Sequence, residues 1–481
     1  MTVRFAGRVV LYSIVGCPHC KAAKFALHEK EIPFTDVSVD QFQASVRDQV
    51  IAVSGVNTVP QIYFNKIYVG GNIELKNAME DPSKWAQLIE EVTNHPPPDG
   101  FPVVPEDSLR LSSSPSDSGV DFVCETDEEA KYIEAIRQSG IIKDHRKGIF
   151  KQRSTFTGNC LVHVFISCGL PFQEAIDKGR HLVDHHYIHR VKHDKKFTND
   201  DSLYRLLEHD DSDALNQGEG QACGIPTVNQ LGEDLRKLIL KIYTNYLSDD
   251  GKKVDYAGIG HSSDFKTYRD MTTLLPKVRV EIASREEKLA FFINVYNALV
   301  IHANVERGPP AGLWQRYKFF NSVKYIIGGQ PYSLQDIENG VLRANRKGVG
   351  MFFRPFYTND PRLPVALEQH EPYIHFALVC GAKSCPPIKT YSADDVMNQL
   401  KMATQAFLEG DDVRVDVSKK TVALSKIFSW YKEDFGGSDV ALLNWICSNM
   451  DESKKKADLQ QLVSEGKTKV TFLPYDWSVN S

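Results

Sequence analysis

Apolar runs and a helix-like segment alternate at the beginning of the chain. Residues 9–12 form an uninterrupted apolar run, which is typical of a buried strand, and the helix-like segment 21–27 follows. Residues 62–64 form a second apolar run, one residue beyond Gln61 and close to Pro60, and proline is tolerated at the start of a strand. The pattern therefore predicts a strand, a tight turn and a helix, then a further strand that begins beside a special proline.

The apolar pattern stops in residues 95–121. Three prolines follow His95, and a serine-rich stretch occupies residues 112–119. Such sequence cannot bury enough apolar surface to order itself, so it predicts a linker that is extended in its proline part and flexible beyond. This linker separates a first domain, residues 1–94, from the rest of the chain.

A second domain is expected over residues 122–210. Helical spacing recurs at 129–136 and 172–183 with a helix candidate between them, and residues 185–191 read as a strand. Three helices followed by a short hairpin predict a winged-helix-like module. The local histidines are His181, His185, His186, His189 and His193. A passage from helix to strand would keep them off one common face, so core packing and a basic surface are favoured over a metal site.

Residues 216–481 are expected to form one further unit. An amphipathic helix is predicted at 231–243, and residues 286–299 are apolar on more than one side, which predicts a buried helix. Residues 374–380 read as a buried strand that ends at Gly381, in which His375 and Cys380 point to opposite faces. A turn would then deliver Cys385 just beyond the strand.

The length of 481 residues fits about three domains. A net charge of −5 gives no electrostatic reason to expect nucleic acid as a partner. Nine cysteines are an odd number, which argues against a complete disulfide framework and for a reducing compartment. We see no signal peptide and no apolar run long enough to cross a bilayer, so we expect a cytoplasmic protein.

Cys17-Pro18-His19-Cys20 lies between the first predicted strand and helix, the context of a dithiol redox motif. Cys17 would sit at the helix N-terminus, where unpaired N–H groups and the helix dipole favour the thiolate. Cys20 could then resolve a mixed disulfide formed on Cys17. Half of a zinc site is the weaker alternative, because no second Cys or His pair follows at zinc spacing.

Three motifs in order, Cys17 with Cys20, then Thr58-Val59-Pro60, then Gly70-Gly71, make residues 7–92 resemble a glutaredoxin. The resemblance implies a thioredoxin fold and glutathione-dependent thiol–disulfide exchange, with Cys17 as nucleophile and Cys20 as resolving thiol.

The same resemblance implies how glutathione would be held. The backbone of Val59 beside Pro60 would pair with the glutathione backbone, Gly71 would allow close approach, and Glu74 would meet the glutathione amino group. Two positions depart from the family, which usually has cations where this chain has Ile14 and Asn57.

The second segment resembles a DEP domain. The phrase Phe-Thr-Gly-Asn-Cys-Leu-Val at 156–162 and the helix-like stretch 172–183 carry the likeness. DEP domains are non-catalytic modules that recruit signalling proteins to membranes or receptors, so the likeness implies docking of this kind.

The third segment resembles the family called domain of unknown function 547, through the stretches 286–298, 333–343, 375–387 and 424–431. The resemblance implies a papain-like α+β fold and a catalytic triad of Glu287, His375 and Cys385, with Glu286 as the alternative acid. The plain alternative is a core histidine with two core cysteines.

The sequence thus predicts a multidomain protein of α/β and α+β domains with a thioredoxin fold, a winged-helix-like module and a papain-like domain. Its expected function is glutathione-dependent reduction of disulfide or glutathionylated protein substrates. The alternative is a non-catalytic redox-sensing adaptor.

Overall fold

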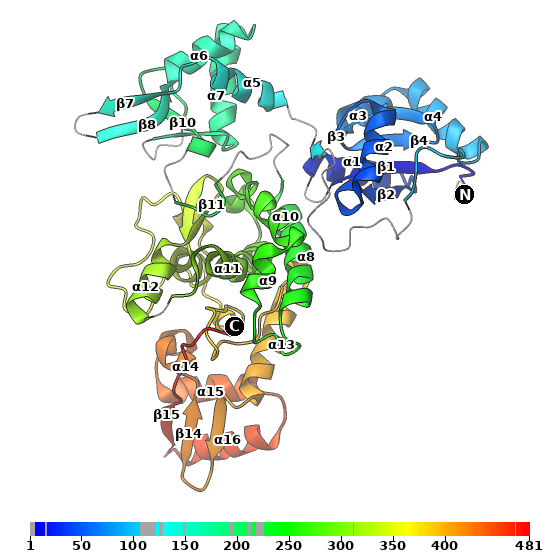
Figure 1. The fold of residues 1–481 in the computed structure, drawn as a ribbon. Helices are drawn as coiled ribbons and strands as arrows, with labels where there is room; N and C mark the ends of the chain where they lie inside the picture. Colours follow the sequence, from blue (N-terminus) through cyan, green and yellow to red (C-terminus); the bar gives the residue numbers. More distant parts are fainter. Residues whose placement is uncertain are drawn as a thin grey trace. The chain divides into compact units, whose positions relative to one another are not determined.

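The structure is a computed structural model (Figure 1). It describes residues 5–14, 17–105, 122–124, 128–147, 150–191, 196–209, 213–217, 226–310, 312–466 and 468–481. The chain divides into two compact units, and the second holds the residues from Thr227 to the C-terminus. The first unit contains the first two domains, which are described separately below.

The first domain is built on a four-stranded sheet in the order β2-β1-β4-β5. The central strand β1 pairs in parallel with β2 and antiparallel with β4, and all five of its residues are buried, as its apolar run predicts. The strands are β1 (Val9–Ser13), β2 (Thr35–Ser38), β4 (Gln61–Phe64) and β5 (Ile67–Gly70), with the short β3 (Thr58–Val59) before β4.

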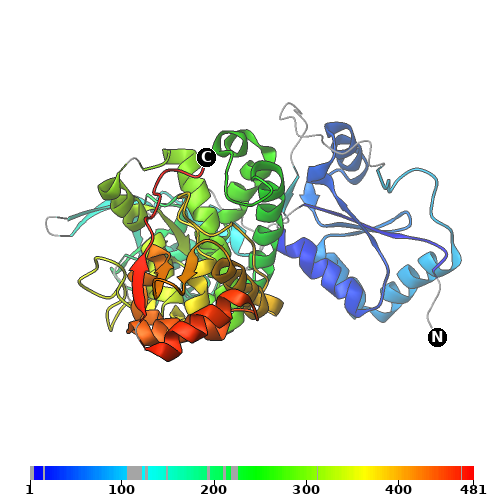
Figure 2. The same cartoon turned by 90° about the horizontal axis from the view of Figure 1, so that it is seen from below.

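Four helices complete this domain: α1 (Pro18–Glu29), α2 (Ala44–Ser54), α3 (Asn72–Glu80) and α4 (Pro82–Asn94). Apolar residues of β1, β4 and helices α1, α3 and α4 share one core. Figure 2 shows the strands of this sheet and the helices beside them from below. The mixed sheet with its flanking helices is the thioredoxin fold that the sequence predicts.

The beginning of the predicted linker packs on this domain. The hydroxyl of Tyr12 donates to the carbonyl of Val103 (2.9 Å), and the ring of Phe101 stacks on Tyr12 at 5.8 Å between centroids. The proline part of the linker is therefore anchored as far as residue 103. Residues 106–121, the rest of the predicted linker, lie outside the described residues.

The second domain contains three helices and a sheet in the order β7-β8-β10-β9. Its elements are α5 (Glu128–Gln138), β7 (Lys143–Lys147), β8 (Phe150–Thr157), α6 (Gly158–Ser167), α7 (Phe172–Asp184), β9 (Ile188–Arg190) and β10 (Leu203–Leu206). The three predicted helices and the final hairpin are present. The β7–β8 hairpin between the first two helices is not predicted by the sequence, because its mostly polar residues give no apolar run.

The third domain is mostly helical. Its helices are α8 (Val228–Tyr246), α9 (Tyr256–His261), α10 (Ser263–Thr272), α11 (Arg285–Arg307), α12 (Leu313–Ser322), α13 (Val396–Glu409), α14 (Lys426–Trp430), α15 (Asp439–Asn449) and α16 (Lys454–Glu465). Two small sheets join β11 (Lys324–Ile327) with β12 (Gln330–Ser333), and β13 (Val413–Asp416) with β14 (Thr421–Leu424) and β15 (Lys469–Phe472). The elements from β13 onward gather on one side of this domain (Figures 1 and 2).

Helix α11 is the buried helix that the sequence predicts, and it extends further than expected. By length and composition it could cross a membrane, which corrects the expectation that no apolar run is long enough. Its most apolar window is 89% buried inside the domain, so neighbouring elements of the domain already cover it. Its apolar surface is therefore that of a core helix.

The strand predicted at 374–380 is wrong. Residues Pro372–Phe376 form a short 3₁₀ helix, η8, and the chain continues to Cys380 without regular structure. These residues are apolar because they are buried: Ile374, Phe376 and Ala377 are at most 1% exposed. Consequently, the alternation of faces expected for His375 and Cys380 does not apply.

Candidate functional site

The first candidate site lies at the N-terminus of α1. Cys17 is the N-cap residue, and its sulfur accepts a hydrogen bond from the backbone N–H of Cys20 (3.2 Å). The same sulfur approaches the carbonyl oxygen of Val59 at 3.8 Å. The thiol of Cys17 therefore faces the helix N-terminus, which favours its thiolate form, and also touches the Thr-Val-Pro segment.

The second thiol of this site differs in its electrostatics. Burial raises the pKa of Cys20 well above its usual value, and the neighbouring Cys17 raises it further. Lys24 opposes this shift through its charge, while its ammonium group also contacts Asp36 (2.5 Å). Cys20 thus stays protonated at neutral pH, as a resolving thiol does before it is needed.

The edge beside Val59 is paired in this structure. The short strand β6 (Val123–Cys124) runs parallel to β3, with Val123 opposite Thr58 and Cys124 opposite Val59. β6 also contacts α1, the helix that Cys17 caps. The glutaredoxin resemblance predicts that this edge pairs with the backbone of glutathione. In the structure the edge pairs with an extended segment of the chain itself.

The remaining predicted ligands lie at the start of α3. Gly71 is the N-cap of α3, and its N–H donates to the carboxylate of Glu74 (2.9 Å). Gly70 has φ +116°, and a Cβ there would come within 2.7 Å of the Glu74 side chain, so only glycine fits. The peptide bond between Val59 and Pro60 is cis. Glu74 is exposed and keeps acceptor capacity beyond its cap hydrogen bond.

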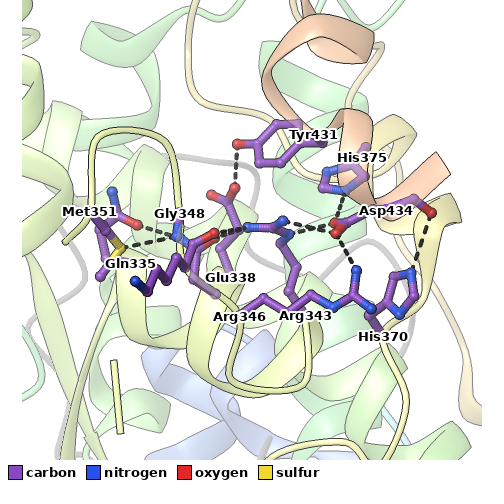
Figure 3. Close-up of polar contacts among 12 residues, drawn as sticks. Gln335, Glu338, Arg343, Arg346, Gly348, Met351, His370, His375, Tyr431 and Asp434 are labelled. Carbon is purple, nitrogen blue, oxygen red and sulfur yellow. Dashed lines mark hydrogen bonds and ion pairs between the residues drawn. The ribbon is translucent and has the colours of Figure 1, made fainter. Parts of the chain in front are cut away.

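A second candidate site lies in the third domain, around a buried ionic cluster (Figure 3). The carboxylate of Asp434 accepts from Arg343 (2.5 and 2.9 Å), Arg346 (2.9 Å) and Nε2 of His375 (2.8 Å). The side chains of Asp434, Arg343 and His375 are 1%, 4% and 2% exposed. Burial lowers the pKa of His375, whereas His375 and Arg343 hold the pKa of Asp434 far below its usual range against the opposing effect of burial.

Glu338 stands beside this cluster on the π-helical turn η6 (Asp336–Leu342). Its carboxylate accepts hydrogen bonds from the hydroxyls of Tyr296 and Tyr431 (Figure 3 shows the latter). The ring of Tyr431 stacks on His375 at 3.9 Å. These contacts fix the imidazole ring between an aromatic face and a carboxylate.

Cys385 and Cys380 meet near this cluster. Their sulfur atoms are 3.0 Å apart, and the hydroxyl of Tyr475 lies 3.3 Å from Cys385 and 3.5 Å from Cys380. The backbone N–H of Cys380 donates to the sulfur of Cys385 at 3.2 Å. Burial alone would raise the pKa of Cys385, but the hydrogen bonds from Cys380 and Tyr475 lower it to about 7.

Both thiols line a cavity of about 310 Å³. Aromatic side chains form much of its wall, and charged or titratable groups stand among them; the lining residues include Arg316, Glu338, His375, Trp430, Tyr431, Tyr475 and Trp477. A cavity of this size and composition suits a small ligand.

The predicted acid of the triad lies elsewhere. Glu287 accepts the N–H of Ser284 (2.8 Å), and Ser284 accepts the N–H of Glu287, which makes a capping box at the start of α11. The carboxylate that meets His375 is Asp434, not Glu287. The structure thus brings Cys385 and His375 to one cavity and replaces the predicted acid.

Family comparisons agree with this division of the chain. Family models match at residues 9–69 (Glutaredoxin), 141–206 (Domain found in Dishevelled, Egl-10, and Pleckstrin, DEP) and 280–408 (Protein of unknown function, DUF547). The three resemblances inferred from the sequence are therefore confirmed, in the predicted order.

Curated relatives match the first domain. Glutaredoxin 1 of Rickettsia typhi is 34% identical over 83 residues, which are 79% of that protein and 17% of this chain. The chain belongs to the glutaredoxin family. Glutaredoxin of Pseudomonas aeruginosa is 33% identical over 81 residues, which are 94% of that protein and 17% of this chain. Glutaredoxin 3 of Escherichia coli K12 is 36% identical over 63 residues, which are 75% of that protein and 13% of this chain. These matches indicate a thiol–disulfide oxidoreductase domain in the N-terminal part of the chain.

The structure brings several residues to the two sites that the sequence does not predict there. Asp434 and Tyr475 come from segments distant in the chain, and no local pattern connects them with His375 or Cys385. The pairing of β6 with β3 was also missed, because two residues carry no periodicity. Cys380 had a usable signal, since it lies five residues before Cys385 and a turn at Gly381 separates them.

Proposed function

We propose that the chain is a glutathione-dependent thiol–disulfide oxidoreductase in which Cys17 is the nucleophile and Cys20 the resolving thiol. The proposal rests on the position of Cys17. Cys17 caps α1, and its sulfur accepts a hydrogen bond from the N–H of Cys20 and lies beside the carbonyl oxygen of Val59. The helix N-terminus lowers the cost of a thiolate on Cys17, and the raised pKa of Cys20 keeps the other sulfur protonated.

The reaction conserves electrons at every step. The Cys17 thiolate attacks the glutathione sulfur of a glutathionylated protein, a Cys17–glutathione disulfide forms, and the protein thiolate leaves and takes up a proton. A second glutathione thiolate then attacks the glutathione sulfur, releases glutathione disulfide and frees Cys17. Alternatively, Cys20 loses its proton, attacks Cys17 and releases glutathione, which leaves a Cys17–Cys20 disulfide for later reduction.

The expected glutathione subsite uses backbone pairing at Val59 beside Pro60, close approach at Gly71 and the carboxylate of Glu74. The pairing of β6 with β3 supports this proposal, because it is the contact that a short extended peptide such as glutathione would make. Glutathione and β6 would then compete for one edge.

The other two domains would direct this activity. The DEP domain would dock the protein to a membrane or a receptor and so bring disulfide or glutathionylated proteins within reach. A papain-like fold and a hydrolase activity of the third domain remain predictions from resemblance. The contacts around Cys385 argue against a hydrolase site. The thiol of Cys385 makes hydrogen bonds with Cys380 and Tyr475, whereas His375 makes its hydrogen bond with Asp434.

The test is the reduction of a glutathione mixed disulfide of a small thiol by the full chain, with glutathione as reductant. We expect catalysis by the wild type, and loss to the uncatalysed rate for Cys17→Ser. The matched control is Cys168→Ser, which changes an exposed thiol of the second domain and should leave the rate unchanged. Equal rates for the wild type and Cys17→Ser would refute the proposal and favour the non-catalytic adaptor.

A further inference from the structure

The third domain holds two thiols in contact. The sulfur atoms of Cys380 and Cys385 are 3.0 Å apart, so they need to approach by only about 1 Å to reach the length of a disulfide bond. Gly381, with φ +80°, and the hydrogen bond from the N–H of Cys385 to the carbonyl of Ala382 (3.0 Å) form the turn that brings them together. A left-handed residue is required in this turn, and glycine supplies it.

The C-terminal segment holds this turn in place. The N–H of Lys383 donates to the carbonyl of Ser478 (2.9 Å), and the N–H of Asn480 donates to the carbonyl of Gly381 (3.1 Å). From the same segment, Tyr475 directs its hydroxyl at both sulfur atoms. The two thiols are thus positioned by contacts from two parts of the chain, and their approach does not depend on a flexible loop.

The two thiols are chemically unequal. The hydrogen bond with Cys385, reinforced by burial, raises the pKa of Cys380 well above its usual value. Cys385 instead receives hydrogen bonds from the Cys380 thiol, the Cys380 N–H and Tyr475, which stabilise its thiolate. This is the division of roles that disulfide exchange needs, with one thiolate that attacks and one thiol that resolves.

A small molecule can reach the pair. Both sulfur-bearing residues line the cavity of about 310 Å³, and Cys380 is only partly buried. Arg316 contributes a positive charge to the cavity, and aromatic rings such as Trp430 contribute apolar surface. Because Glu338 places a negative charge in the same wall, the cavity suits a small disulfide that carries both carboxylate and ammonium groups, as glutathione disulfide does.

The imidazole of His375, which lines the same cavity, contacts other residues. Nε2 of His375 bonds with Asp434 and its ring stacks on Tyr431, and none of the contacts that the structure gives His375 joins it to Cys385. An activated cysteine of the hydrolase type needs its base within hydrogen-bond reach. In its place Cys385 has a second thiol, and that contact points to redox chemistry.

We propose that Cys380 and Cys385 are a second redox site, which exchanges with low-molecular-weight disulfides such as glutathione disulfide and alternates between a dithiol and an intradomain disulfide. The Cys385 thiolate attacks glutathione disulfide, a Cys385–glutathione bond forms, and one glutathione leaves. Cys380 then gives up its proton and attacks the sulfur of Cys385, and a second glutathione leaves. The dithiol is oxidised by two electrons, and glutathione disulfide is reduced to two glutathione molecules.

The experiment uses the full chain with Cys17→Ser and Cys20→Ser, so that the first site cannot contribute to the result. The outcome is therefore independent of whether the function proposed for Cys17 and Cys20 is correct. The protein is equilibrated in mixtures of glutathione and glutathione disulfide, quenched with acid, alkylated and digested with trypsin. Because Lys383 lies between the two cysteines, an intradomain disulfide appears as two linked peptides. We expect the linked pair to grow as glutathione disulfide replaces glutathione and to disappear when the ratio is reversed.

Two single variants assign the roles. Cys380→Ser should accumulate a glutathione adduct on Cys385, and Cys385→Ser should accumulate much less on Cys380. The control is Cys447→Ser, which removes a buried thiol of the same domain and should leave the linkage intact. Alkylation of both cysteines without linkage at every ratio, in a protein that stays folded by circular dichroism, would overturn the proposal. Equal adducts in the two single variants would overturn the assignment of the attacking thiol.

Discussion

Replacing Asp434 by alanine should destabilise the third domain strongly. The substitution removes a carboxylate that is 1% exposed and leaves the guanidinium of Arg343, 4% exposed, without its charged partner. Loss of one partner of a buried ion pair costs about 3–5 kcal/mol, because the other charge stays buried without compensation. We therefore expect Asp434→Ala to lower the free energy of unfolding of this domain by that amount.

The assay is urea unfolding of the full chain at pH 7, followed by tryptophan fluorescence. Trp445 reports on the affected region, because its ring lies 4.7 Å from that of Phe435, the residue after Asp434. The matched control is Asp439→Ala, which breaks an ion pair with Lys432 (2.7 Å) whose aspartate is 53% exposed and should cost about 0–1 kcal/mol. Equal losses for the two variants would refute the reasoning that burial decides the value of the pair.

Three further predictions concern pH and the glutathione subsite. Burial lowers the pKa of His302 from 6.5 to about 4, so the folded domain binds fewer protons than the unfolded chain between these pH values. Its free energy of unfolding should therefore fall by about 3 kcal/mol as the pH decreases from 6.5 to 4. Urea midpoints measured across this range should show this loss for the wild type and not for His302→Gln. Val123→Pro removes a backbone donor from β6, so release of the Val59 edge should lower the KM for glutathione by up to about fivefold, the equivalent of about 1 kcal/mol, and an unchanged KM would contradict competition at that edge. Glu74→Gln keeps an acceptor for the Gly71 N–H but loses the charge, so the KM for glutathione should rise by about twofold to fivefold at constant kcat, whereas a fall in kcat alone would contradict a binding role.

Local signals predicted the secondary-structure elements around the first site. The apolar run before Cys17, the helix after it and the proline before residues 61–64 are each recognisable within about ten residues, and the structure has all three elements where they were expected. The capping box at Ser284 and Glu287 was equally readable from its spacing. It shows that Glu287 was better interpreted as the cap of its own helix than as a catalytic acid.

The site of the third domain depends on contacts that no local pattern contains. Asp434 lies 59 residues after His375, within a short polar stretch that reads as ordinary surface, although its side chain is 1% exposed. The apolar stretch 374–380 reads as a strand because burial alone makes a run apolar, whatever its backbone conformation. Only the packed domain shows that this run places Cys380 against Cys385.

The most direct test of thiol–disulfide exchange through Cys17 is to trap its glutathione adduct. Cys20→Ser removes the resolving thiol, so incubation of this full-length variant with glutathione disulfide, followed by peptide mapping under non-reducing conditions, should locate glutathione on Cys17. The double variant Cys17→Ser with Cys20→Ser should carry none in that region. Absence of the adduct from Cys17 in the folded single variant would contradict the account.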